Sequence, residues 1–268
     1  MSEPWDARQQ AQAAQPGYAG MRSRVAVVDA VRGVALLAMA HFHFIFDLEM
    51  FGYLERGTAG SFPWKPYART IAATFLFLVG LSLVLAHSWR PNPLGALRDR
   101  RYWRRIAQVA GAAAIITVAT YFTIPTAFIF FGILHHIALA SLLGLLFVRL
   151  PWPALSVLAM AAFALPRFVA LDQLNGMAGW WTGLASTTPL SNDFVPLFPW
   201  FAAVLVGMAF GRLALQTGWA AKAADWEMTS APARALRWLG RRSLAVYLLH
   251  QPVIIGLMFV YAKATGHI

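Results

Sequence analysis

Four polar side chains in one apolar segment have types and a spacing suited to proton transfer. The segment VAVVDAVRGVALLAMAHFHFIFDL carries Asp29, Arg32, His43 and Asp47. At about 100° per residue these four return to one face of a helix, whereas His41 points about 160° away from His43. Asp47 follows His43 by one helical turn, so its carboxylate can hold one imidazole nitrogen and leave the other free. We therefore predict that His43, oriented by Asp47, is a general base; the alternative is that the two residues only satisfy each other.

Asp29 and Arg32 have the spacing of an ion pair, which either anchors a helix end or contributes charge to a site. Two further segments carry polar residues in apolar surroundings. Adjacent His135 and His136 point about 100° apart, so at most one of them is expected in a given site. Ser243, Tyr247 and His250 share one helical face beside Gln251, either as part of a site or as interhelical hydrogen bonds. Asp193 is expected to be a solvated loop aspartate, with an outer cavity as the alternative.

These residues must be positioned by membrane helices. The chain of 268 residues is 59% hydrophobic and 12% charged, and its apolar runs of about 20 residues match the thickness of a bilayer. Backbone groups in lipid must pair within the chain, and the runs lack the alternation of barrel strands. We predict an all-α polytopic bundle of about seven spans, over residues 25–48, 67–88, 104–124, 128–148, 151–171, 196–215 and 243–263.

The distribution of charge predicts the orientation of these spans. Basic residues are concentrated in 90–105 and 234–242, which fall on one side of a seven-span count, whereas the alternate segments 49–66 and 172–195 carry acidic residues. Loops rich in Lys and Arg stay in the cytoplasm. The amino terminus is therefore predicted inside and the carboxyl terminus outside. Nucleic-acid binding is not needed to explain the net charge of +11.

Two domains are expected, a disordered cytoplasmic tail over 1–23 and a membrane domain over 24–268. The tail is rich in Gln and Ala and lacks the pattern of a cleaved signal peptide. The chain has no cysteine, which excludes disulfides and a cysteine nucleophile. No bound metal and no permanently bound cofactor are expected.

Several blocks of the chain resemble one enzyme family. The segment VVDAVRGVALLAMAHFHFIFDL resembles the start of the heparan-alpha-glucosaminide N-acetyltransferase catalytic domain family, in particular its bacterial members. Later blocks are also similar: FLFLVGLSL (75–83), FFGILHHIALASLL (130–143), DFVPLFPWFAAVLVGMAFGR (193–212) and RSLAVYLLHQPV (242–253). The spacing of Arg32 and His43 also looks like the arginine and histidine pair of the wider transmembrane acyltransferase superfamily.

The resemblance implies a membrane acyltransferase that moves an acetyl or other acyl group from cytoplasmic acyl-CoA to a hydroxyl or amine of an extracytoplasmic glycan. Its similarity to bacterial members implies the plasma (inner) membrane of a bacterium. It implies that His43 is the base and that Arg32 places the acyl donor or stabilises charge. Tyr247, His250, His135 and His136 are candidates for stabilising the oxyanion. Residues 48–66 contain no histidine, where the eukaryotic heparan enzymes have one. The heparan substrate is therefore not implied, and the partners expected are the lipid bilayer, acyl-CoA and a sugar or glycan acceptor.

Three other functions fit some of the same residues. A proton-coupled or small-solute transporter would use Asp29, Arg32, His43 and Asp47 as a relay, although the chain lacks the internal repeat of many transporters. A haem protein would use paired histidines from facing helices. A non-catalytic scaffold would not need His43.

Overall fold

The computed structural model describes residues 25–88 and 92–266, and the expected tail over 1–23 lies outside them. The described residues are helical with no named strand; one isolated bridge joins Leu171 and Ala185. The chain divides into two compact units. The terminal unit combines residues up to Phe75 with residues from Trp226, and the central unit runs from Leu76 to Asp225. Each unit is described by itself.

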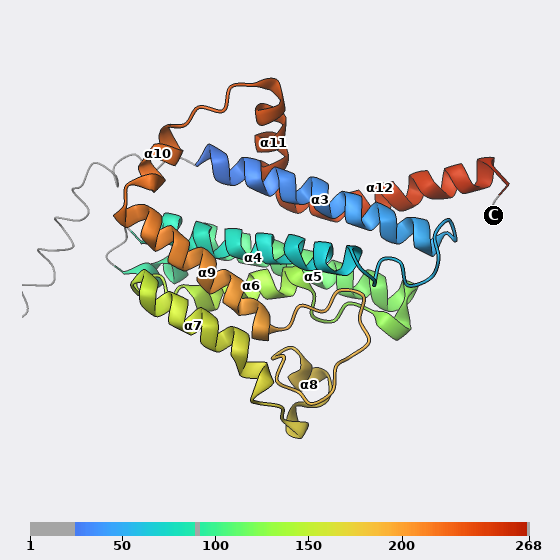
Figure 1. Cartoon of the computed structure of the whole chain (residues 1–268), viewed down its shortest axis with the longest axis horizontal. Coiled ribbons are helices and arrows are strands. Elements are labelled where there is room, and N and C mark those ends of the chain that lie inside the picture. Colours follow the sequence, from blue (N-terminus) through green and yellow to red (C-terminus); the bar gives the residue numbers. More distant parts are fainter. Residues whose placement is uncertain (1–24, 89–91, 267–268) are drawn as a thin grey trace, which may run out of the picture. The chain divides into compact units, whose positions relative to one another are not determined.

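The terminal unit is built from helices at both ends of the sequence. It contains α3 (Ala26–Met50), the first half of α4 (Trp64–His87), α11 (Ala231–Arg241) and α12 (Ser243–Ala264). Helices α11 and α12 both pack on α3 (Figure 1). After α3 the chain turns through a loop whose amides at Gly57 and Ala59 donate to the two carboxylate oxygens of Glu49, at 2.6 and 2.7 Å. The first span of the sequence is therefore held by segments about 200 residues away.

Two glycines bring the backbones of α3 and α11 into contact. A Cβ atom at Gly33 would overlap the carbonyl group of Leu236, and one at Gly240 would overlap that of Asp29. Only a residue without a side chain fits at either position, as at close helix contacts in membranes. Further along α3, Leu36 and Met39 form an apolar core with Ile71 of α4. The face of α3 that carries the predicted stripe is thus fixed against its neighbours.

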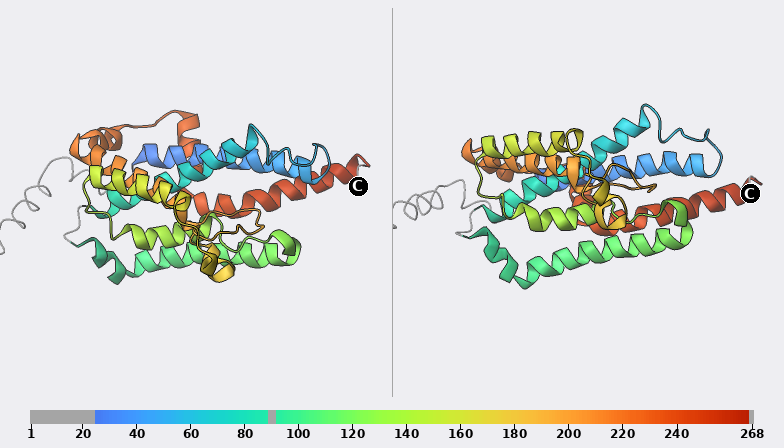
Figure 2. Two further views of the ribbon diagram at one scale, coloured as in Figure 1. Left: turned by 60° about the horizontal axis from the view of Figure 1, so that its bottom comes forward. Right: turned by 90° about the horizontal axis from the view of Figure 1, so that it is seen from below.

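The central unit consists of the second half of α4, α5 (Arg100–Thr123), α6 (Ile133–Gly144), α7 (Trp152–Ala164), α8 (Met177–Trp180), α9 (Leu197–Gln216), α10 (Trp219–Asp225) and the short 3-10 helices η2 (Pro93–Arg98), η3 (Pro125–Ala127), η4 (Leu165–Arg167) and η5 (Asp172–Leu174). Helices α5 and α6 form a hairpin and lie side by side in both views of Figure 2. Helix α9 packs on α7. It also meets α4 at a reciprocal glycine contact, because Gly80 touches the Val204 carbonyl and Gly207 touches that of Phe77.

Within residues 25–88 and 92–266, five helices are long and apolar enough to cross a membrane: α3, α4, α5, α9 and α12. They correspond to five of the predicted spans, and the chain is a multi-pass membrane protein. The predicted spans 128–148 and 151–171 correspond to shorter apolar helices, α6 and α7 with η4. Residues 128–132 are not helical because their backbone groups pair elsewhere; the amide of Ile129, for example, donates to the Thr120 hydroxyl at 3.0 Å. The count of seven spans and the orientation of the termini stay predictions.

Candidate functional site

The terminal unit brings His43 of α3 against polar side chains of α12. The His43 Nδ1 atom lies 2.6 Å from the Gln251 amide oxygen and 3.0 Å from His250 Nε2. The amide nitrogen of Gln251 in turn donates to Asp47 Oδ1 at 2.6 Å. We refer to His43, Asp47, His250 and Gln251 as the histidine cluster. Asp47 therefore reaches His43 through Gln251, where the sequence predicted a direct contact within one helical turn.

The hydrogen bonds of the histidine cluster fix the tautomer of His43. His250 Nδ1 lies 2.6 Å from the Tyr247 carbonyl oxygen, which only accepts, so that nitrogen carries the proton and His250 Nε2 is an acceptor. His43 Nδ1 consequently faces two acceptors, His250 Nε2 and the Gln251 amide oxygen, and must carry a proton itself. The proton of neutral His43 is therefore on Nδ1. Nε2 keeps its lone pair and has no hydrogen-bond partner among the described residues, which is the arrangement that a general base requires.

Asp47 sets the orientation of the Gln251 amide. Its side chain is fully buried, at 0% exposure, and a carboxylate accepts hydrogen bonds only. The Gln251 NH₂ group must therefore face Asp47 and its oxygen must face His43. The second carboxylate oxygen, Oδ2, is buried without a donor among the described residues. The buried Asp47 side chain therefore lies directly behind the amide that contacts His43.

His41 occupies different surroundings, as the helical periodicity predicts. It is exposed, and its ring packs against Trp64 and Tyr67 of α4 at centroid distances of 5.7 and 5.9 Å. Its Nδ1 atom is 3.4 Å from the Tyr67 hydroxyl. The two histidines of α3 thus face different helices, and His41 serves as a matched control for His43.

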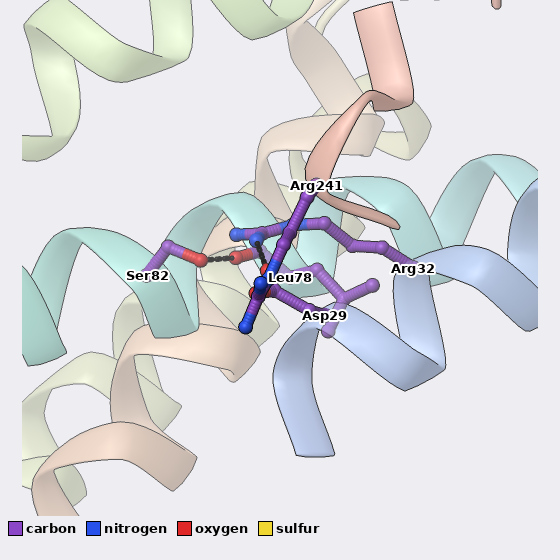
Figure 3. A network of polar contacts seen from close by, with 5 residues as sticks. All are labelled: Asp29, Arg32, Leu78, Ser82 and Arg241. Atoms are coloured by element: carbon purple, nitrogen blue, oxygen red, sulfur yellow. Dashed lines mark hydrogen bonds and ion pairs between the residues drawn. The ribbon is translucent and has the colours of Figure 1, made fainter. Parts of the chain in front are cut away.

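Asp29 and Arg32 form the predicted ion pair, with a third member that the sequence did not indicate. Arg32 Nη1 lies 2.9 Å from Asp29 Oδ1, and Arg241 Nε of α11 lies 3.6 Å from Oδ2. Figure 3 shows both guanidinium groups directed at the one carboxylate. Asp29 is buried, whereas the Arg241 side chain is 46% exposed. The group keeps a net charge of +1, about 16 Å along α3 from His43 at 1.5 Å per residue.

The remaining predicted site residues divide between the units. Tyr247 belongs to the terminal unit and packs against the core around Leu36 and Met39. His135 and His136 belong to the central unit, where they point apart as predicted. His135 Nε2 lies 3.3 Å from the Thr117 hydroxyl, and His136 Nδ1 donates to the Val195 carbonyl at 3.1 Å.

Asp193 is held by the start of α6, contrary to the expectation of a solvated loop aspartate. Its Oδ2 atom accepts the Ile133 amide at 2.9 Å, and a side chain at Gly132 would overlap it. An amide at the start of a helix lacks a partner within the helix, so Asp193 caps it from 60 residues away. Burial raises the pKa of the Asp193 carboxyl to about 6, and the hydrogen bond from Ile133 opposes that rise.

Gln251 is the residue of the cluster that sequence reasoning missed. The sequence indicates it only as the neighbour of a polar helical face, because it does not reveal which side chains of α3 and α12 meet. The feature of the sequence that could have indicated Gln251 as a site residue is its position directly before Pro252. Proline has no amide hydrogen, so α12 loses a main-chain hydrogen bond at this point, as is common at functional positions of membrane helices.

Buried ionisable side chains on apolar helices define the class of the protein, a polytopic membrane protein with a histidine site inside its helices. Residues 24–252 match the family model described as heparan-alpha-glucosaminide N-acetyltransferase, catalytic. The chain belongs to this family, which confirms the resemblance seen in the sequence and indicates a membrane acetyltransferase. Neither a curated protein nor a solved structure matches the chain significantly.

Proposed function

We propose that the protein transfers an acyl group, in the first instance acetyl, from cytoplasmic acyl-CoA to a hydroxyl or amine of an extracytoplasmic glycan. The observation that carries the proposal is the free Nε2 atom of His43, opposite a Nδ1–H that Gln251 and His250 hold in place. Family membership supports the transfer of acetyl. The charge pattern of the loops supports an orientation with the basic segments in the cytoplasm. The resemblance to bacterial members of the family supports the plasma (inner) membrane of a bacterium.

In the proposed reaction, His43 Nε2 accepts the proton of the acceptor O–H or N–H while the acceptor atom attacks the thioester carbonyl carbon. The tetrahedral intermediate then collapses, the C–S bond breaks, and the CoA sulfur leaves with the proton from His43. Asp47, acting through Gln251, stabilises the imidazolium between the two steps. No covalent bond to the enzyme is required.

The hydrogen bonds also bear on which group stabilises the oxyanion. Both nitrogens of His250 are engaged, one with the Tyr247 carbonyl and the other with His43. In this arrangement we assign His250 to positioning His43, and Tyr247 stays the candidate from α12 for the oxyanion. Arg32 and Arg241, with the exposed Arg234 and Arg242, supply positive charge for the phosphates of the acyl donor.

Release of free CoA thiol tests the proposal. Purified protein in nanodiscs is given acetyl-CoA and a panel of sugar acceptors, and wild type is compared with His43→Ala and His41→Ala. We expect acceptor-dependent release that falls by about 10²- to 10⁴-fold in His43→Ala, the range of general-base catalysis, and that persists in His41→Ala. Equal loss in both variants contradicts the assignment of the base. Absence of release with every acceptor, together with no binding of acetyl-CoA, would favour the transporter or the scaffold.

A further inference from the structure

The segment between α7 and α9 carries aromatic and polar side chains that the proposed chemistry does not use. Trp180, at the end of α8, packs against Phe130 with ring centroids 6.0 Å apart, and Phe130 stacks on Phe194 at 5.7 Å. The Trp180 indole N–H donates to the Thr187 hydroxyl at 3.2 Å. Both Trp180 and Phe130 are partly exposed. All of these residues belong to the central unit.

A network of four exposed polar side chains is joined to the Trp180 indole through Thr187. Asn175 accepts the amide and the hydroxyl of Thr187, at 3.0 and 2.9 Å, and donates to Ser186 at 2.8 Å. The Ser186 hydroxyl lies 2.5 Å from Asp172 Oδ1. These bonds orient the side chains and leave hydrogen-bonding groups for a ligand, because Asp172 keeps a second carboxylate oxygen and Asn175 a second amide hydrogen. We call Trp180, Phe130, Asp172, Asn175, Ser186 and Thr187 the Trp180 surface.

The charged residues near the Trp180 surface indicate which charge a ligand can carry. Residues 168–196 contain Asp172 and Asp193 and no lysine or arginine, and residues 121–134 carry no charged side chain. Arg167, directly before this segment, lies over the Phe163 ring of α7, 5.0 Å from its centroid. A sulfated or uronic-acid polymer would meet no cation among the residues of the Trp180 surface and would be repelled by Asp172. A ligand with many hydroxyl groups and an apolar ring face would instead find an aromatic ring with acceptors and donors at its edge.

Anchoring in the membrane interface is the other common use of exposed aromatic side chains. Phe168 and Leu190 fit that use, since they are 84% and 83% exposed and make no ring contact or side-chain hydrogen bond among the described residues. Trp180 differs, because its N–H is bonded to Thr187 and its ring adjoins the polar network. Phe168 therefore provides a control from the same segment.

We propose that the Trp180 surface is a saccharide subsite for uncharged glycans, with a sugar ring against Trp180 and its hydroxyls on Asp172 and Asn175. This inference rests on the proposed glycan acceptor and adds where that acceptor is held and which charge it must lack. It also predicts that the acceptor differs from the anionic polymer that gives the family its name.

Direct binding measurements on full-length protein in nanodiscs test the subsite. The probes are a neutral N-acetylglucosamine tetramer and a heparin tetrasaccharide, titrated by calorimetry and observed by saturation-transfer NMR. We expect the neutral tetramer to bind, with an affinity that stays constant between about 50 and about 500 mM salt, and the heparin fragment not to bind. Preferential binding of heparin, or no binding of the neutral tetramer, overturns the inference.

Variants test whether the neutral tetramer binds at the Trp180 surface and distinguish this binding from catalysis. Trp180→Ala should weaken the neutral tetramer about tenfold and Asn175→Ala a few-fold, whereas Trp180→Phe, which keeps a ring, and Phe168→Ala should lose little. Asn175 is exposed, so its variant tests the surface even if Trp180→Ala does not fold. His43→Ala should bind like wild type.

If the tetramer binds but no acyl transfer occurs, the subsite stands and the proposed function fails. If transfer occurs with unchanged affinity and KM in Trp180→Ala and Asn175→Ala, the subsite fails alone.

Discussion

Removing the Gln251 amide, or exchanging it with the Asp47 carboxylate, tests the central feature of the site, the amide that links a buried carboxylate to His43. In Gln251→Leu the bridge is removed and only His250 holds His43 Nδ1–H. A hydrogen bond to a charged or strongly polarised group contributes about 1.5 to 3 kcal/mol. Since about 1.4 kcal/mol corresponds to a tenfold change in rate, we expect turnover to fall by about 10- to 100-fold.

The exchange distinguishes loss of catalysis from loss of folding. Gln251→Glu alone places two carboxylates where a 2.6 Å hydrogen bond stands now, which should lower both activity and thermal stability. In the double variant Asp47→Asn/Gln251→Glu, the amide introduced on α3 donates to the carboxylate introduced on α12, and that carboxylate accepts His43 Nδ1–H. Every hydrogen bond is kept, with the negative charge one step closer to His43. We therefore expect the double variant to recover activity relative to Gln251→Glu.

The assay is release of CoA thiol over pH 6 to 9, with thermal unfolding measured on the same samples. Full activity in a folded Gln251→Leu protein would refute the argument that the amide fixes His43. The same conclusion would follow if the double variant were folded but no more active than Gln251→Glu.

Three further predictions concern other parts of the chain. Gly240→Ala should lower the unfolding temperature and release α11 to protease, because overpacking costs about 1–3 kcal/mol, whereas Gly256→Ala, where no atom is nearby, should not. Arg241→Gln should raise KM for acetyl-CoA a few-fold, most strongly at low salt, with kcat nearly unchanged; a change in kcat alone would contradict its assignment to the acyl donor. Asp193 has a raised pKa, so the folded state binds its proton more tightly and stability should fall as pH rises from about 4 to about 6, by at most about 3 kcal/mol. Thermal unfolding of Asp193→Asn should lack this decline, and an identical pH profile in both proteins would contradict it.

The sequence predicted what depends on local periodicity. Long apolar runs located α3, α4, α5, α9 and α12, because a span of about 20 apolar residues has few other stable structures. The helical periodicity placed His41 and His43 on different faces, because the directions of both side chains are set within one helix.

Features that depend on distant partners could not be predicted. The pairing of Gln251 with His43 requires the register between α3 and α12, and the pairing of Arg241 with Asp29 requires the contact between α3 and α11. The start of α6 at Ile133 depends on Asp193, 60 residues later. The apolar run FIFFG before it carries no signal that distinguishes an extended segment from a helix.

The pairing of α3 with α11 and α12, two helices near the end of the sequence, has a consequence for how the protein is made. Helix α3 is synthesised early, yet Arg241 and Gln251, which pair with its carboxylates, follow about 200 residues later. Until then Asp29 has only Arg32 beside it, and Asp47 lacks the amide that it binds in the finished protein. An ionisable group without its partner is costly in lipid. We therefore expect α3 to be less stable in the bilayer until α11 and α12 have been made, and a chain that stops before α11 to leave the carboxylates of α3 without these partners.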